Sequence, residues 1–436
     1  MQRWVGRTGV VAGVVVTAAA LLAFGAAVGG SPAPDPAQAV PRAAGTSGRA
    51  ATTVEALQAE LSRLPGNVDG WSALGLAYVT QARLTGDPTF YTKAQGALDK
   101  SLQLRPDDNA QALTGQAVLA SARHEFSAAL ELADRSLALN SYNSTTYGVR
   151  ADALTELGRY DEAQASVQRM LDLRPGTDAL TRGSYQLELR GETDRARDAL
   201  QRAREAAGGP GDKAYASFYL GELAWNGQDP SGARGLYDQA LEDDKTYLPA
   251  LAGRARTKAA AGDIAGALAD YRDVTTRLPL PQYVVEYGEL LEATGDTAAA
   301  QEQYDLVRAE QQLFVSQGSV VDLELALFEA DRGDPAAALA AGRAAYDARP
   351  NAILVQDAYA WALQSAGRSA EALPLARASV RLGTPLPGLY YHLGVIEAAA
   401  GNRTEARAAL QKALALNPAW SPLYAPRAVQ LLATLT

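Results

Sequence analysis

One motif recurs along the chain about every 34 residues. The segment Glu156–Pro175 reads ELGRYDEAQASVQRMLDLRP, and Ala399–Pro418 reads AAGNRTEARAALQKALALNP. Both segments have Gly third, Ala eighth, Leu eighteenth and Pro twentieth. The eighth-place Ala recurs at Ala94, Ala129, Ala163, Ala196, Ala233, Ala267, Ala300, Ala338, Ala372 and Ala406. A motif repeated at this spacing predicts a solenoid of stacked units in place of one closed core.

Each copy is expected to form two amphipathic helices joined by a short turn. A second small residue precedes the Ala, at Gly75, Ala117, Ala151, Ser184, Gly221, Ala255, Gly288, Ala326, Ala360 and Gly394. Small residues let two helices cross closely, and bulky residues at helical spacing fill the remaining space. Six copies place Gly in the turn, where a positive φ ends the first helix, at Gly158, Gly262, Gly295, Gly333, Gly367 and Gly401.

The repeat resembles the tetratricopeptide repeat. The first copy has the W-x2-L-G-x2-Y pattern at Trp71, Leu74, Gly75 and Tyr78, and the last copy has Leu393, Gly394, Ala406, Leu410, Ala413 and Pro418 in register. The resemblance covers residues from about 66 to 419. It implies an all-α fold, an α-solenoid in which about ten helix-turn-helix repeats form a right-handed superhelix. The first helix of each repeat would line the concave face, where partners of the family usually bind.

The N-terminal residues 1–30 predict a membrane signal. No charge occurs between Arg7 and Asp35, and about twenty uncharged residues suffice to cross a bilayer as a helix. Arg3 and Arg7 predict a cytoplasmic N-terminus, which places the repeats outside the cytoplasm at the cell membrane. The A-x-A motif that ends at Ala39 is the alternative, because cleavage there would release a secreted protein.

The remaining boundaries are predicted as a flexible linker over 31–52, the repeat array over 53–419 and a capping helix over 420–436. A lone second helix is expected at the front of the array, ending before Pro65. The first-helix pattern is weakest around Gln116 and Asp322. The second helices of copies four and seven are expected to be longer, through Arg204 and Gln311.

The composition excludes several functions. The formal net charge is −9, which argues against a nucleic-acid partner. No Cys is present, so disulfides, thiol catalysis and thiolate metal sites are excluded. His124 is expected in a solvated turn, and His392 is expected to pack or hydrogen-bond on a first helix. We identify no catalytic residue, no cofactor and no metal site, and no segment outside the repeats is long enough for a catalytic domain. The sequence therefore predicts a protein that is not an enzyme.

The resemblance implies three groove positions on each first helix. They lie three residues before the small residue, one after it and four after it. The predicted partner-binding residues are Asp152, Tyr185, Glu188, Phe218, Glu222, Trp225, Arg256, Glu289, Glu292, Asp357, Trp361 and Gln364. Aromatic residues beside acids would anchor a peptide that carries Arg, Lys or apolar side chains. Trp225 and Trp361 are equally consistent with the core.

The predicted function is a non-catalytic scaffold of the cell envelope that binds a partner protein or peptide in the concave groove. The alternative is an extracytoplasmic receptor that stacks a small ligand or glycan on the groove aromatics. Family members that grip a C-terminal carboxylate use a Lys three residues before the small residue. No copy here has a basic residue at that position, so no chaperone carboxylate clamp is expected.

Overall fold

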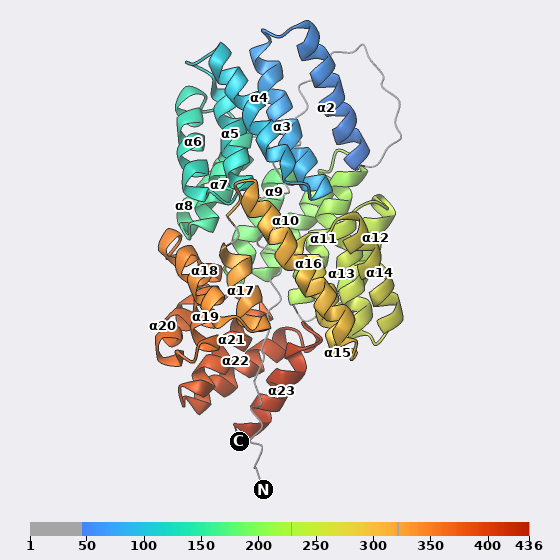
Figure 1. Cartoon of the computed structure of the whole chain (residues 1–436), viewed down its shortest axis with the longest axis vertical. Helices are drawn as coiled ribbons and strands as arrows, with labels where there is room; N and C mark the ends of the chain where they lie inside the picture. Colours follow the sequence, from blue (N-terminus) through green and yellow to red (C-terminus); the bar gives the residue numbers. More distant parts are fainter. Residues whose placement is uncertain (1–45, 228, 321, 436) are drawn as a thin grey trace. The chain divides into compact units, whose positions relative to one another are not determined.

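A computed structural model describes residues 46–227, 229–320 and 322–435 (Figure 1). Within these ranges every regular element is a helix, and within each of the two compact units described below each helix packs against the next one along the chain. The helices form ten consecutive pairs, one for each copy of the repeat. The all-α solenoid expected from the sequence is therefore confirmed. The predicted membrane signal, residues 1–30, lies outside the described residues.

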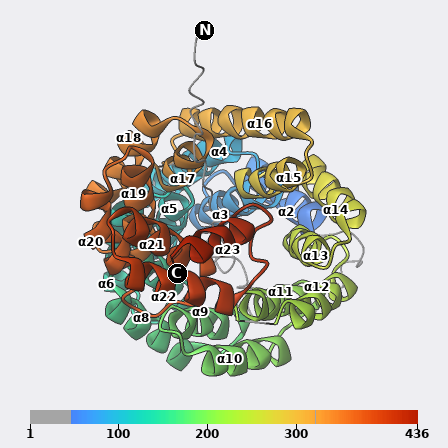
Figure 2. The same cartoon turned by 90° about the horizontal axis from the view of Figure 1, so that it is seen from below.

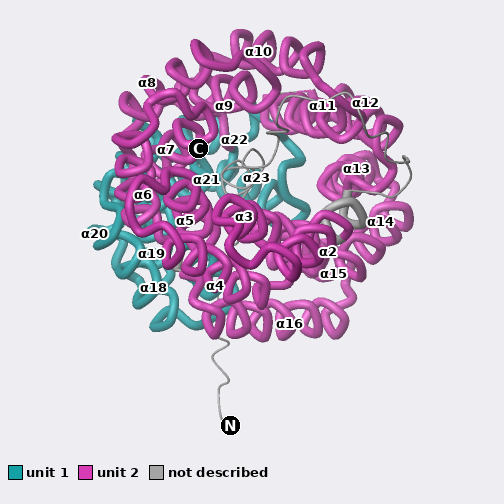
Figure 3. Tube along the Cα trace, turned by 90° about the horizontal axis from the view of Figure 1, so that it is seen from above, with its two compact units in different colours: residues 1–16, 322–381, 387–436 teal, residues 17–321, 382–386 magenta. Residues whose placement is uncertain are grey.

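The chain divides into two compact units (Figure 3). Unit 2 begins with α2 (Thr46–Arg63) and contains the first seven pairs together with residues Leu382–Leu386. Its first helices are α3 (Val68–Thr85), α5 (Ala110–Ala122), α7 (Ser144–Glu156), α9 (Thr177–Glu188), α11 (Pro210–Asn226), α13 (Leu248–Ala260) and α15 (Pro281–Ala293). Its second helices are α4 (Thr89–Leu104), α6 (Phe126–Leu139), α8 (Tyr160–Leu173), α10 (Thr193–Glu205), α12 (Pro230–Asp243), α14 (Ile264–Arg277) and α16 (Thr297–Ser316).

Unit 1 contains the last three pairs and the closing helix. Its first helices are α17 (Asp322–Arg332), α19 (Ile353–Ser365) and α21 (Pro387–Ala399). Its second helices are α18 (Pro335–Ala348), α20 (Ser369–Ser379) and α22 (Arg403–Leu416), followed by α23 (Tyr424–Thr434). The core of this unit is rich in Ala and is closed by Trp420 and Tyr424.

The repeated Ala of the second helix lies where the two helices of a pair meet. All ten of these Ala residues are between 0% and 1% exposed. The residue four positions after this Ala, also on the second helix, packs against the small residue of the first helix. At Gly221 an added Cβ would lie 2.5 Å from the ring of Tyr237, and at Gly75 it would lie 2.5 Å from Leu98. At these two positions the large residue leaves no room for a Cβ, because a side chain there would hold the two helices apart.

The turns within the pairs follow the expected chemistry. The six turn glycines named above all have positive φ, for example 84° at Gly262. In the second pair His124 occupies this position with a φ of 63°. This left-handed conformation is higher in energy for a residue with a side chain than for Gly. Its ring stacks on Phe126, with 5.5 Å between the ring centroids. His124 is half-buried, so the predicted turn position is confirmed, whereas its side chain is packed against a neighbouring ring.

Some helix boundaries differ from the expectations. α2 begins at Thr46 and so takes in residues 46–52 of the segment expected as linker. α16 has 20 residues, as its predicted extension requires. α10 ends at Glu205 and so includes Arg204 as predicted, but its 13 residues do not make it longer than the other second helices of unit 2. The extra turn of the following pair belongs to α11, where Pro210 begins a helix one turn earlier because proline suits a first helical position.

Candidate functional site: the inner face of unit 2

The first helices of unit 2 form an inner layer, and the second helices form an outer layer (Figures 2 and 3). α9, α11 and α13 lie inside α10, α12 and α14 in both views along the axis. This arrangement places the predicted groove positions toward the inside of unit 2. We call this surface the inner face. It is defined by residues on five first helices: Asp152, Arg182, Tyr185, Glu188, Glu222, Arg256, Glu286, Glu289 and Glu292.

One buried ion pair joins α7 to α9. Arg182 donates from Nε and Nη2 to both carboxylate oxygens of Asp152, at 2.9 and 2.7 Å. The Arg182 side chain is 4% exposed and that of Asp152 is 10% exposed. Burial raises the pKa of Asp152 to about 6, and the attraction of Arg182 opposes this rise. The carboxyl is therefore ionised at neutral pH, and both of its oxygens are committed to the neighbouring repeat.

A second buried network joins α11, α13 and α15. Arg256 of α13 donates to Glu222 of α11 and lies 3.8 Å from Glu286 of α15. Two carboxylates thus flank a single guanidinium, which spans three consecutive repeats. Burial raises the pKa of Glu286, while Arg256 opposes that rise. Arg182 and Arg256 are thus both paired with carboxylates of the inner face.

Three tyrosines of the second helices donate hydrogen bonds to acidic residues of the inner face. The hydroxyl of Tyr237 donates to Glu222 at 2.6 Å, that of Tyr271 to Glu286 at 3.0 Å, and that of Tyr304 to Glu292 at 2.8 Å. These tyrosines were not predicted as part of the site. The sequence does carry a signal for them, because three consecutive repeats have Tyr four residues after the repeated Ala.

Arg182 and Glu286 were also missed, and they share one position. Each lies two residues before the small residue of its first helix, and each meets a predicted groove residue 30 positions earlier. In both contacts, the residue directly after the small residue of one first helix meets the residue two places before the small residue of the next first helix. Opposite charges 30 residues apart are the sequence signal that could have identified them.

The predicted aromatic anchors lie in the core. Phe218, Trp225 and Trp361 are only 1–2% exposed. Phe218 packs edge-on against Tyr219 and Tyr247, and the guanidinium of Arg256 lies 5.8 Å from the centre of the Trp225 ring. Trp225 and Trp361 therefore lie in the core, the alternative given for them above, and Phe218, predicted only for the groove, is buried as well. As placed, these rings cannot serve as open stacking surfaces for a glycan or a peptide.

The remaining predicted residues differ in exposure. Glu289 and Glu188 are both buried. Burial, with a smaller contribution from Glu222, raises the pKa of Glu188 to about 7. Tyr185 and Glu292 of unit 2, and Gln364 of unit 1, are half-buried and keep part of their surface. On the inner face, Tyr185 and Glu292 are the predicted residues that a partner could contact directly.

Asp357 belongs to a separate buried cluster in unit 1. Both of its carboxylate oxygens lie within 3.0 Å of Nδ1 of His392, which is completely buried. The His392 ring stacks on Trp361 with 4.1 Å between centroids, and Trp361 donates from Nε1 to Asp331 at 2.8 Å. The predicted packing and hydrogen bonding of His392 is confirmed.

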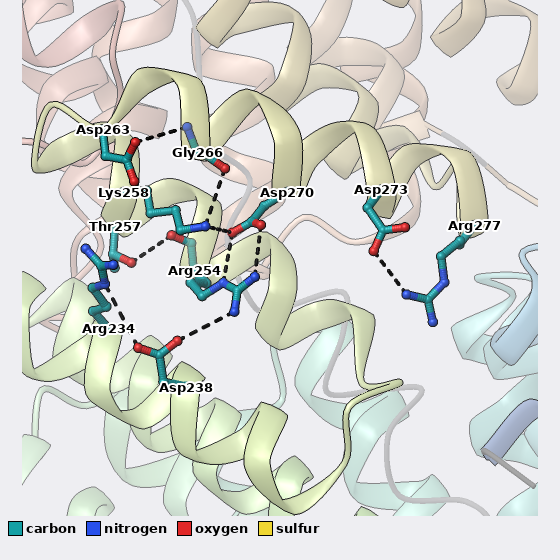
Figure 4. A network of polar contacts seen from close by, with 10 residues as sticks. All are labelled: Arg234, Asp238, Arg254, Thr257, Lys258, Asp263, Gly266, Asp270, Asp273 and Arg277. Carbon is teal, nitrogen blue, oxygen red and sulfur yellow. Dashed lines mark hydrogen bonds and ion pairs between the residues drawn. The ribbon is translucent and has the colours of Figure 1, made fainter.

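A further network fixes the outer part of unit 2 (Figure 4). Arg254 of α13 donates twice to Asp270 of α14, both times at 2.9 Å, and Lys258 reaches the same carboxylate at 2.7 Å. Arg254 also lies 3.8 Å from Asp238 of α12. Burial alone would raise the pKa of Asp270, but the hydrogen bonds from Arg254 and Lys258 outweigh it and lower the pKa. Three consecutive helices are thereby held in register.

The described residues offer neither a metal site nor a membrane span. No group of three or more His, Asp or Glu side chains there is placed to hold a metal ion. Across 46–227, 229–320 and 322–435, no helix combines the length and the apolar character that a membrane span needs.

Several solved structures are similar to this chain. A tetratricopeptide repeat protein from Parabacteroides merdae is 19% identical, over 59% of this chain and 98% of its own, with a TM-score of 0.35. A human IFIT1 dimer with PPP-AAAA is 15% identical over 76% of this chain and 78% of its own, with a TM-score of 0.48. YrrB, described as a protein with an unusual peptide-binding site, is 22% identical over 42% of this chain and 93% of its own, with a TM-score of 0.28. A comparison with curated proteins gave no match.

Family models match three segments of the chain. Each is described as a tetratricopeptide repeat, and the matched residues are 144–177, 180–247 and 387–420. These segments cover the third, fourth, fifth and tenth helix pairs, and the other pairs repeat the same Ala contact and the same order of helices. The chain is a tetratricopeptide repeat protein.

Proposed function

We propose that this chain is a non-catalytic scaffold that binds a partner protein or peptide on the inner face of unit 2. Proteins with this fold are scaffolds for protein–protein interaction. The observations that carry the proposal are the two buried polar networks, which bridge consecutive first helices: Asp152 with Arg182, and Glu222 with Arg256 and Glu286. A surface fixed in this way before binding loses little entropy when a partner arrives.

The chemistry of the partner follows from what the inner face leaves accessible. Arg182 and Arg256 are buried against carboxylates and have little charge to offer. Tyr185 and Glu292 keep part of their surface and present a ring and a carboxylate. A segment with apolar and basic side chains matches these groups, because the ring gives contact area and the carboxylate favours a cation.

The place of action is a second element of the proposal. We propose that residues 1–30 direct the repeats out of the cytoplasm, either as a retained membrane anchor or as a signal cleaved near Ala39. The uncharged run and the flanking Arg3 and Arg7 support this proposal. Membrane fractionation combined with mass spectrometry of the N-terminal peptide would test it. A soluble cytoplasmic protein that retains Met1 would contradict it.

The binding proposal can be tested by affinity capture from solubilised envelope of the native host. One bait would be residues 46–436, and a second would carry Tyr185→Ala with Glu292→Ala. A matched control would carry Tyr142→Ala with Glu205→Ala, since both residues are exposed and lie away from the inner face. The proposal predicts a partner that the control bait retains and the second bait loses. Equal retention of the partner by all three baits would contradict the proposal and indicate that the partner binds another surface of the chain.

A further inference from the structure

The seventh pair of unit 2 returns to the first two pairs. Figure 2 shows α16 beside α4. The hydroxyl of Thr92 in α4 donates to the Gln317 side chain at 3.2 Å, and the Val320 N–H donates to the carbonyl of Arg123 at 2.8 Å. Near the same edge, a Cβ on Gly86 would lie 3.4 Å from Leu278 and Leu280. Unit 2 is therefore a turn of the solenoid that closes on itself.

The contact is made by an extension that the other second helices lack. α16 has 20 residues, whereas the other second helices of unit 2 have 13 to 16. We call residues 310–320 the closing segment. Phe314 of this segment packs, partly buried, against the apolar cluster of the first pairs. The neighbouring Leu313 and Val315 point away and are 44% and 54% exposed.

Several buried polar atoms of the closing segment, and one of Arg123, have no hydrogen-bond partner within the described residues. Within the described residues, neither side-chain polar atom of Gln311 has a hydrogen-bond partner, although the residue is 5% exposed. Oε2 of Glu310, Oγ of Ser319 and Nε of Arg123 are likewise buried without a partner there. Burial raises the pKa of Glu310 to about 8, which means that the carboxyl is largely protonated at neutral pH. Unpaired buried polar groups weaken a contact, because water would satisfy them once it opens.

This combination differs from the contacts within the pairs, where the repeated Ala residues are fully buried. Phe314 and the two hydrogen bonds of Gln317 and Val320 hold the closing segment in place, while several buried polar atoms favour its release. From the geometry we infer that the closing segment is a reversible latch, which closes unit 2 by docking Phe314 and opens it by releasing α16 from α4. Opening would uncover the inner face to a folded partner, but the inference does not depend on where a partner binds.

The latch can be tested by measuring a distance across it in the full chain. The chain contains no Cys, so Gly96→Cys and Ser316→Cys would introduce a unique pair of spin-label sites. Both positions are exposed, and no atom lies within 4 Å of a Cβ built on Gly96. Double electron–electron resonance should detect a short-distance population and a longer one. A single distance, short or long, in every variant would overturn the inference.

Three further variants fix the expected direction. Phe314→Ala should raise the ratio of the long to the short population about tenfold, the change produced by a loss of 1.4 kcal/mol. Leu313→Ala is the matched control and should leave the ratio unchanged. Gln311→Leu removes the unpaired amide at similar volume and should lower the ratio, a result that misfolding cannot imitate. A ratio that rises in Gln311→Leu, or that Phe314→Ala leaves unchanged, would contradict the latch.

Discussion

The guanidinium of Arg182 in α9 is hydrogen-bonded to both carboxylate oxygens of Asp152 in α7. These residues are 30 positions apart and occupy neighbouring repeats. The pair is almost completely buried, so each charge depends on the other to offset the cost of leaving water. The contact therefore holds one first helix to the next.

Arg182→Met should lower the free energy of unfolding by about 3–5 kcal/mol, because it leaves the Asp152 carboxylate buried without its partner. Urea unfolding followed by circular dichroism measures this change. Arg159→Met is the control, since Arg159 makes a similar bidentate ion pair with Glu162 at the exposed surface. The double variant Asp152→Leu with Arg182→Met should recover most of the loss. An equal loss in the double variant would show that packing, not the charge, is responsible.

Glu188 should make the stability of unit 2 depend on pH. Its pKa is raised to about 7 from an ordinary value of 4.5, mainly because it is buried. Between these two values the folded chain holds a proton that the unfolded chain releases, so stability falls as the pH rises. The fall amounts to at most about 3 kcal/mol. Urea unfolding from pH 4 to pH 8 should show a smaller fall for Glu188→Gln than for the exposed control Glu205→Gln. Identical slopes in the two variants would contradict the assignment.

Gly221 and Gly235 should respond in opposite directions to the same substitution. A Cβ on Gly221 would meet the Tyr237 ring at 2.5 Å, so Gly221→Ala should destabilise the chain by about 1–3 kcal/mol. Gly235 lies on the exposed side of α12 with no atom within 4 Å of such a Cβ. Gly235→Ala should stabilise the chain by about 0.5–1 kcal/mol, because Ala favours a helix more than Gly does. Thermal unfolding of both variants measures the difference, and a stable Gly221→Ala variant would show that the pair can separate at little cost.

His392 should stabilise unit 1 through Asp357. His392→Phe keeps a ring against Trp361 but removes the hydrogen bonds to the buried carboxylate. The expected loss is about 3–5 kcal/mol, as for other buried charges that lose a partner. Hydrogen exchange should report this loss in α19 and α21, with α11 and α13 unchanged. Combining His392→Phe with Asp357→Leu should restore protection, and a failure to do so would assign the effect to ring packing.

The repeated small residues were sufficient to predict the pairs of helices. Ala94 and its equivalents recur about every 34 residues, and close packing of helices permits only small residues at such positions. The same logic relates Gly221 to Tyr237, since the Tyr237 ring leaves no room for a Cβ at Gly221. Local rules of this kind act within one repeat, and sequence periodicity reveals them directly.

The inner face was harder to predict, because its contacts join different repeats. Trp225 occupies a position that the family resemblance assigns to the groove, but Arg256 of the next first helix lies over its ring. The extent of such coverage depends on how tightly the solenoid curves and on the side chain that the next repeat supplies. The sequence pattern of a single repeat reveals neither the curvature nor the side chain of the next repeat. For this reason the aromatic residues were assigned to the groove and Arg182 was missed.

The most direct test of the account is hydrogen–deuterium exchange of the chain with and without its captured partner. Binding on the inner face predicts added protection in α7, α9, α11, α13 and α15, with α8, α10, α12 and α14 unchanged. Protection confined to the second helices or to the connections between repeats would contradict the account and place the partner on the outer surface.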